Sequence, residues 1–158
     1  NMEGKFLILD DKIILNSKID ENNINRSLFT FEHKWKIDEK YIYNLLNVIE
    51  ADDNIILEFE NYNWKGSFKS MSYVDSLFLK NINEKYKFQN LIKVIRNNQY
   101  EMAFERLLGL LFYLEQKNSD PIIGDIHEEL NKISNPWNYT YDKYIVSKKN
   151  QYFNYIFK

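Results

Sequence analysis

The chain has 158 residues, of which 44% are hydrophobic and 16% aromatic, and its formal net charge is −2. This composition is typical of a protein with a packed core and excludes an intrinsically disordered chain. The chain has no cysteine, which excludes disulfides, thiolate catalysis and cysteine-ligated metals. Its longest apolar run, 107–114, is too short to cross a bilayer, and no secretory signal is visible at its start. We therefore expect a cytoplasmic protein that does not enter a membrane.

The first segments have the pattern of strands. Two short apolar runs, Lys5–Leu9 and Lys12–Leu15, flank Asp10-Asp11, a pair that favours a tight hairpin turn. Both faces of these runs are apolar, so we expect at least one of them to be a central strand. The segment Phe29–Ile37 alternates apolar and polar residues, which predicts a strand with Thr30 on its solvent face.

A helix is predicted next, capped by Asp38, and a second hairpin after it. The helix has an apolar stripe at i, i+3, i+4 and i+7, formed by Ile42, Leu45, Leu46 and Ile49. In the hairpin, the alternation in Ile55–Glu60 predicts one strand, Asn61-Tyr62-Asn63 the turn, and Trp64–Met71 the returning strand.

The second half has the pattern of helices. Ser72 and Asp75 have capping-box spacing for a short helix that reaches about Lys80, although a strand is possible there. An amphipathic stripe follows. After it comes the strongest predicted helix, which starts at Asn98, with Glu101 in its first turn, and is apolar around most of its circumference. We expect this helix to be the central one. The stripe consists of Phe88, Leu91, Ile92 and Ile95.

The last third of the chain gives weaker patterns. Asp120-Pro121 predicts the start of a helix whose inward stripe contains Ile122, Ile126, Leu130 and Ile133. The aromatic tail after Pro136 fits a helix, which we favour, or a hairpin of 139–146 with 151–157.

Together these elements predict an α+β fold. We expect an N-terminal antiparallel sheet of about four to five strands, with one inserted helix, packed against a C-terminal helical half. With four glycines, two prolines and no repeat or linker, residues 1–158 are interpreted as one domain.

The two histidines are weak candidates for chemistry. His127 opens the sequence His-Glu-Glu-Leu-Asn, which resembles the start of a zinc-protease helix, but Asn131 stands where the second histidine ligand would be. The other imidazole, His33, lies between Phe31 and Trp35 on an apolar strand face. We interpret both as structural histidines and expect no metal, no cofactor and no catalytic residue.

Two alternative functions use other residues. Asp20 followed by Glu32-His33-Lys34 has the residue order of Mg²⁺-dependent nucleases, in which carboxylates hold the metal and lysine stabilises the developing charge. The segment around Lys148-Lys149 is rich in tyrosines, which could stack on bases, so it could bind nucleic acid. The chain has only three arginines, however, so nucleic acid is the less expected partner.

The segment from Glu50 to Trp64 is the preferred candidate for a binding site. Residues 1–62 carry 13 acidic and 7 basic residues, and no basic residue lies within 50–60. Carboxylates without local counter-charges favour a basic partner, and neighbouring tyrosine and tryptophan are typical interface anchors. The predicted partner-binding residues are Glu50, Asp52, Asp53, Glu58, Glu60, Tyr62 and Trp64.

These observations favour a non-catalytic protein that binds another protein. In size, mild acidity, lack of cysteine and aromatic content the chain is similar to bacterial immunity proteins, which cover the active site of a toxin. It is also similar to small phage-encoded inhibitors of host defence. The likeness is one of profile and not of motif, and it implies a basic partner such as a toxin or nuclease.

Overall fold

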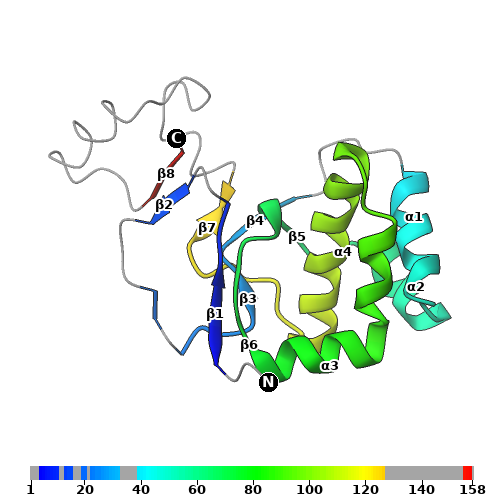
Figure 1. Cartoon of the computed structure of the whole chain (residues 1–158), viewed down its shortest axis with the longest axis horizontal. Helices are drawn as coiled ribbons and strands as arrows, with labels where there is room; N and C mark the ends of the chain where they lie inside the picture. Colours follow the sequence, from blue (N-terminus) through cyan, green and yellow to red (C-terminus); the bar gives the residue numbers. More distant parts are fainter. Residues whose placement is uncertain are drawn as a thin grey trace, which may run out of the picture.

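The computed structural model describes residues 4–10, 13–15, 19–20, 22–32, 39–126 and 155–157. In this part of the chain the strands lie on one side and the helices on the other (Figure 1). The predicted α+β class is confirmed. No helix within these residues is long and apolar enough to cross a membrane.

The described residues contain eight short strands, which form three small sheets. The first sheet has the order β1-β6-β3 and is antiparallel. In the second, β4 pairs antiparallel with β5 and parallel with β7. The third is the antiparallel pair β2-β8. The predicted sheet of four to five strands is therefore wrong in its count, since no sheet has more than three strands in the described residues. The strands are β1 (Lys5–Ile8), β2 (Ile13–Leu15), β3 (Arg26–Ser27), β4 (Phe29–Phe31), β5 (Gly66–Ser67), β6 (Ser72–Asp75), β7 (Gly124–Asp125) and β8 (Tyr155–Phe157).

The predicted first hairpin is wrong. Strands β1 and β2 pair with distant partners, β6 and β8, and not with each other. The carboxylate of Asp10 takes no part in a two-residue turn but lies 2.7 Å from the ammonium group of Lys69. Strand β1 lies at the edge of its sheet with Leu7 and Ile8 exposed, and β2 belongs to a two-stranded sheet. In the described residues neither is therefore the central strand that was expected of at least one of them.

In the described residues, four α-helices and the 3₁₀ helix η2 make up the other side, and a second 3₁₀ helix, η1, follows β5 and precedes β6. The helices are α1 (Glu39–Val48), α2 (Asp53–Glu60), η1 (Phe68–Ser70), α3 (Ser76–Tyr86), η2 (Phe88–Lys93) and α4 (Asn98–Gln116). The stripe predicted for α1 is confirmed, because Ile42, Leu45, Leu46 and Ile49 are all buried. Its predicted cap, Asp38, lies outside the described residues.

Helix α2 occupies the segment predicted as a strand. The prediction failed because the apolar residues Ile55, Ile56 and Phe59 fit a helical stripe as well as an alternating strand. The side chain of Asp52 decides for the helix, since it accepts a hydrogen bond of 2.9 Å from the backbone N–H of Ile55 and caps the N-terminus. In this helix the side chain of Phe59 points into the core and is buried.

The start of α3 also differs from its prediction. The segment Ser72–Asp75 is the strand β6, as in the alternative prediction, and the helix begins only after it. Asp75 is the N-cap, because its carboxylate accepts a hydrogen bond of 2.7 Å from the N–H of Phe78. Phe88, Leu91 and Ile95 contribute to the core from η2 and the residues after it, whereas Ile92 points to solvent.

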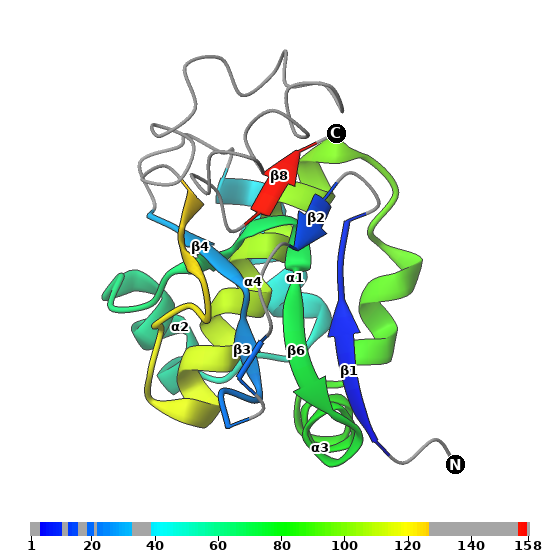
Figure 2. The same ribbon diagram turned by 90° about the vertical axis from the view of Figure 1, so that its left-hand side faces the viewer.

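Helix α4 is central, as predicted. It lies between the strands on one side and α1 on the other, and α3 runs from the end of β6 along the bottom of the molecule (Figures 1 and 2). Asn97 caps it through hydrogen bonds to the N–H groups of Gln99 and Tyr100, one residue before the predicted start. A glycine in its middle permits a close approach to β5: a Cβ on Gly109 would lie 2.0 Å from the carbonyl oxygen of Lys65.

The core consists of two hydrophobic clusters. The larger joins α1, α3 and α4 and includes Trp64 and Val74. The smaller lies among the strands and consists of Leu28, Phe29, Phe31, Phe68, Met71 and Ile126. All three residues of β4 are buried, so the expectation that Thr30 faces water is wrong. β4 is the middle strand of its sheet, between β5 and β7.

The helix predicted from Pro121 is wrong over 122–125, whereas Ile126, a member of its predicted stripe, is helical and buried. The N–H groups of Ile122 and Ile123 donate to the carbonyls of Ser27 and Leu28, so this segment runs extended beside β3 and β4 and enters β7. Residues 155–157 form a strand, which contradicts the favoured helix for that part of the tail. The remaining residues of both predictions, 127–154, lie outside the described ones.

Candidate interaction site

The acidic segment folds into the loop before α2, α2 itself and the turn after it. Two of its carboxylates meet lysines from the second half of the chain. Glu50 forms an ion pair with Lys87, and the carboxylate of Glu58 lies 3.8 Å from the ammonium group of Lys117. The tertiary fold therefore places a lysine beside each of these two carboxylates, although the segment 50–60 itself contains no basic residue.

Two further carboxylates stabilise the start of α2. Asp52 is the N-cap, and Asp53 lies in the first helical turn. Negative charge at this end of a helix interacts favourably with the partial positive charge of its free N–H groups. The hydrogen bond of Asp52 gives that residue a structural role, whereas Asp53 remains exposed.

The aromatic residues of the segment differ in exposure. Trp64 is only 1% exposed, and its indole N–H donates a 3.0 Å hydrogen bond to the carbonyl of Phe59. The prediction that Trp64 contacts a partner is therefore wrong, because the helical form of α2 brings Phe59 into a stack against it, with ring centroids 5.7 Å apart. Tyr62, in the turn, is 49% exposed.

An exposed surface remains on the outer sides of α1 and α2, which we call the α1–α2 face. Its apolar part is formed by Tyr43 (37% exposed), Leu57 (57%) and Tyr62. Both tyrosine rings lie against the buried ring of Phe59, with centroid separations of 5.5 and 6.0 Å. The complete face consists of Glu39, Tyr43, Asp53, Leu57, Glu60 and Tyr62.

Hydrogen bonds join the tyrosines of this face to its carboxylates. The hydroxyl of Tyr43 donates to Glu60 over 3.1 Å, and that of Tyr62 donates to Glu39 over 3.5 Å. Burial, followed by the neighbouring carboxylates, raises the pKa of both tyrosines above its usual value, so both remain donors. A neutral donor leaves the negative charge of the glutamate in place, unlike an ion pair.

Sequence reasoning included Asp53, Glu60 and Tyr62 in the candidate site but missed Glu39, Tyr43 and Leu57. Leu57 lies in the segment predicted as a strand, and in the helical form of α2 it is exposed. Tyr43 could have been found, because it lies off the buried stripe of a correctly predicted helix.

The residues of the alternative functions are only partly described. Asp20 accepts hydrogen bonds from the backbone and side chain of Asn22, so it organises its own turn. Glu32 is exposed after the end of β4, while His33, Lys34, His127 and Lys148 lie outside the described residues. Within the residues placed by the structure, no three histidine, aspartate or glutamate side chains are grouped to hold a metal ion.

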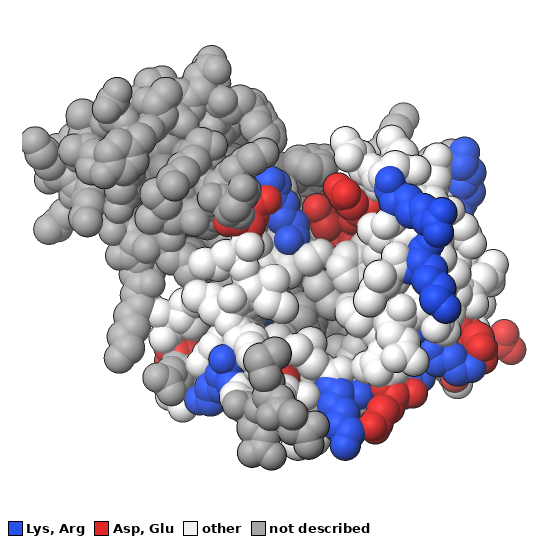
Figure 3. Space-filling model, viewed as in Figure 1, with Lys and Arg blue, Asp and Glu red and all other residues white. Residues whose placement is uncertain are grey.

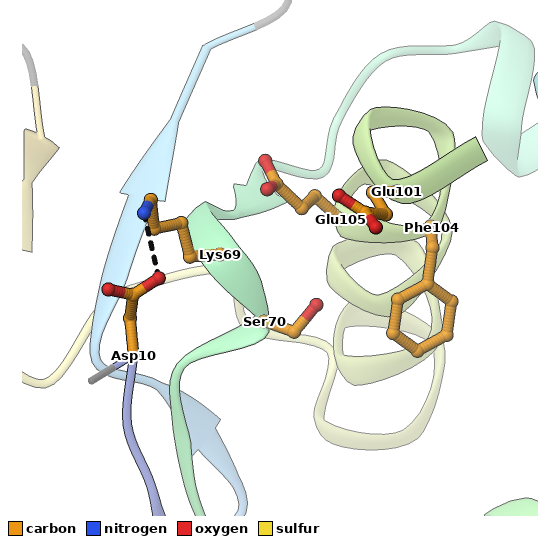
Figure 4. Close-up of a pocket in the computed structure, with 6 residues that line it drawn as sticks. All are labelled: Asp10, Lys69, Ser70, Glu101, Phe104 and Glu105. Atoms are coloured by element: carbon orange, nitrogen blue, oxygen red, sulfur yellow. Dashed lines mark hydrogen bonds and ion pairs between the residues drawn. The ribbon is translucent and has the colours of Figure 1, made fainter. Parts of the chain in front are cut away.

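A second candidate site is a cavity of about 260 Å³ between the end of β1, η1 and α4 (Figure 4). Acidic and basic side chains meet in this part of the surface, where the strands adjoin the helices (Figure 3). Lys69 and Ser70 have left-handed backbone conformations, with φ of 50° and 57°, which turn η1 toward α4. The lining residues are Asp10, Lys69, Ser70, Glu101, Phe104 and Glu105.

Glu105 is the most perturbed group of this cavity. Burial raises its pKa to about 7, although Arg106 and the backbone N–H and charge of Lys69 act in the opposite direction. Arg106 itself is buried, with its guanidinium group 4.9 Å from the ring centre of Phe31 and bonded to the carbonyl of Met102. The i, i+4 spacing of Glu101 and Glu105 is a sequence signal that places two acids on one helix face.

Comparison of the chain with protein-family models, with curated proteins and with solved structures finds no significant match.

Proposed function

We propose that this chain is a non-catalytic cytoplasmic protein that binds a basic protein, of the toxin or nuclease kind, through the α1–α2 face. In this role it would act as an inhibitor or immunity protein. The observation that supports the proposal is an exposed apolar patch of Tyr43, Leu57 and Tyr62 bordered by Glu39, Asp53 and Glu60.

The composition of the face suits a protein interface. Tyrosine offers a large contact area at a low cost in conformational entropy, and its hydroxyl supplies a hydrogen bond at the rim. Because Phe59 supports both rings from below and Glu39 and Glu60 hold both hydroxyls, the tyrosines are preorganised for contact. Preorganisation lowers the entropy lost on binding.

The negative charge of the α1–α2 face favours a positively charged partner. No lysine or arginine of the described residues forms an ion pair with Glu39, Asp53 or Glu60. Such carboxylates repel one another and attract a positively charged surface, mainly by raising the association rate. On a basic nuclease, they would occupy the positions at which phosphates of the substrate bind.

The proposal is tested by charge reversal. Glu58, which the sequence suggested as a target, is unsuitable because a lysine there would face Lys117. The double variant Asp53→Lys with Glu60→Lys reverses only exposed groups and should weaken partner binding by at least about tenfold, since rim charges govern association. The measurement is calorimetric titration against the partner captured from the native host.

The control is Glu84→Lys on α3, an exposed glutamate outside the face, which should leave the affinity unchanged. Unchanged affinity in the double variant would contradict the assignment of the face. Cleavage of DNA or RNA by the purified protein with Mg²⁺ would instead favour the nuclease alternative, and a steep salt dependence of a mobility shift would favour nucleic-acid binding.

A further inference from the structure

The cavity beside η1 has an excess of negative charge. Its lining contains three carboxylates, those of Asp10, Glu101 and Glu105, and one ammonium group, that of Lys69. Lys69 is already engaged by Asp10 at 2.7 Å. Glu105 accepts a hydrogen bond from the backbone N–H of Lys69, and Glu101 lies one helical turn before it on α4, where both glutamates line the open volume (Figure 4).

The other lining residues of the cavity are Ser70 and Phe104, and the ring of Phe104 is held in place. Phe104 lies between the two glutamates in the sequence. Its ring packs on the ring of Phe88, with centroids 5.5 Å apart. One turn further along α4, the close approach of Gly109 to the backbone of Lys65 fixes the helix against the strand that leads into η1. The distance across the cavity is thus set by backbone contact and not by flexible side chains.

Paired carboxylates beside a fixed aromatic ring are the elements that bind organic cations. A carboxylate accepts two hydrogen bonds from a guanidinium or ammonium group, and the ring offers both an apolar surface and a cation–π contact. A divalent metal ion is less suited, because Ca²⁺ and Mg²⁺ take six or more oxygen ligands and Asp10 is held by Lys69. Above pH 7, where both glutamates are ionised, an anion would be repelled.

We propose that this cavity binds an organic cation, a guanidinium or primary ammonium group on a short carbon chain, with the charged group between Glu101 and Glu105 and the chain against Phe104. The cavity, at about 260 Å³, is smaller than a typical drug-sized pocket and fits a ligand the size of an arginine side chain. None of its lining residues belongs to the α1–α2 face, so this site is independent of the proposed function.

Binding should depend on pH through Glu105. The charged groups around its carboxylate are Glu101 and Arg106 on its own helix, Lys69 on η1 and Asp10 after β1. With the pKa of Glu105 at about 7, the group is mostly ionised at pH 8 and mostly protonated at pH 6. A cation requires the ionised form, so its affinity should fall by about tenfold between pH 8 and pH 6.

The experiment is an NMR titration of backbone amides with butylguanidinium, and with butylurea as a neutral ligand of the same shape. At pH 8 we expect butylguanidinium to shift the amides of Lys69, Ser70 and Phe104 with a dissociation constant of about 1 mM or lower, and butylurea to have no effect. Glu105→Gln should weaken binding by at least about tenfold and abolish its pH dependence. Glu84→Gln, on α3, is the matched control and should change neither.

A third ligand, a capped Gly-Arg-Gly peptide, distinguishes the sources of the cation. Tighter binding of the peptide than of butylguanidinium would assign the site to an arginine of a protein partner, and equal or weaker binding to a free metabolite; both results support the cavity as the site. Equal binding of butylurea, shifts confined to residues outside the cavity, or no shifts at either pH would overturn the proposal.

Discussion

At the scale of single residues, position in the fold decides what each acid does. Glu115 pairs with Lys85 at 2.6 Å and accepts a hydrogen bond from Tyr86; burial alone would raise its pKa, but these partners lower it below its usual value. Glu105, on the same helix, lies against the cavity, where burial dominates and raises its pKa to about 7. Of these two glutamates on one helix, Glu105 therefore has a pKa above the ordinary value and Glu115 a pKa below it.

Glu105 should make stability depend on pH. The folded state binds its proton more tightly than the unfolded chain, where the ordinary pKa is 4.5. The contribution of Glu105 to the free energy of unfolding should therefore be largest below about pH 4.5, decrease as the pH rises to about 7, and be lost above that pH. Glu105→Gln should be more stable than the parent at pH 8, by on the order of 2 kcal/mol, and similar to it at pH 5.

Urea denaturation of the parent and of Glu105→Gln at both pH values checks this prediction. Glu84→Gln, which changes an exposed acid, serves as the reference. A constant difference between Glu105→Gln and the parent at the two pH values would show that Glu105 does not hold its proton in the folded state.

At the scale of the elements, α4 is placed by a backbone contact. A Cβ at Gly109 would lie 2.0 Å from the carbonyl oxygen of Lys65 and 2.8 Å from the Cα of Gly66. Neither atom can move as a side-chain end would, so α4 and β5 would have to separate. Gly109→Ala gains about 1 kcal/mol of helix propensity but should lose about 3 kcal/mol to overpacking.

The expected net effect of Gly109→Ala is a loss of about 2 kcal/mol of stability, measurable as a lower midpoint in thermal or urea unfolding. The control is Gln116→Ala, an exposed residue at the end of the same helix. Higher stability of Gly109→Ala would mean that α4 and β5 are not in such close contact.

At the scale of the whole molecule, burial is uneven. Helix α4 carries buried residues on all sides in its second half, including Leu107, Leu110 and Leu111. Strand β1 lies at a sheet edge, and Leu7 and Ile8 are more than 40% exposed. Regions with few buried apolar contacts open locally at low free-energy cost, whereas central helices open only on global unfolding.

Hydrogen exchange should show this difference. We expect the amides of 107–111 to exchange at least about a hundredfold more slowly than those of β1, because opening the helix disrupts the larger hydrophobic cluster. The measurement is native-state exchange followed by NMR or mass spectrometry. Equal protection of β1 and α4 would indicate that the sheet edge is covered in solution.

By itself the sequence determined those elements whose apolar spacing fits only one type of secondary structure. The stripe of α1 has four apolar residues at helical spacing and no competing alternation, and α4 is long and apolar enough to be identified as the central helix. The α+β class and the acidic character of the segment before Tyr62 followed from the same kind of evidence. Exposed Asp53, Glu60 and Tyr62 were found in this way.

Only the tertiary structure decided the pairings and the partners. Asp10 meets Lys69, Glu58 meets Lys117 and β1 meets β6, each across more than fifty residues of chain. Short apolar runs fit a strand and a helix equally well, so α2 was settled by the cap of Asp52 and by the burial of Phe59 against Trp64. Contacts between residues so far apart in sequence depend on how whole elements pack, and no local spacing encodes them.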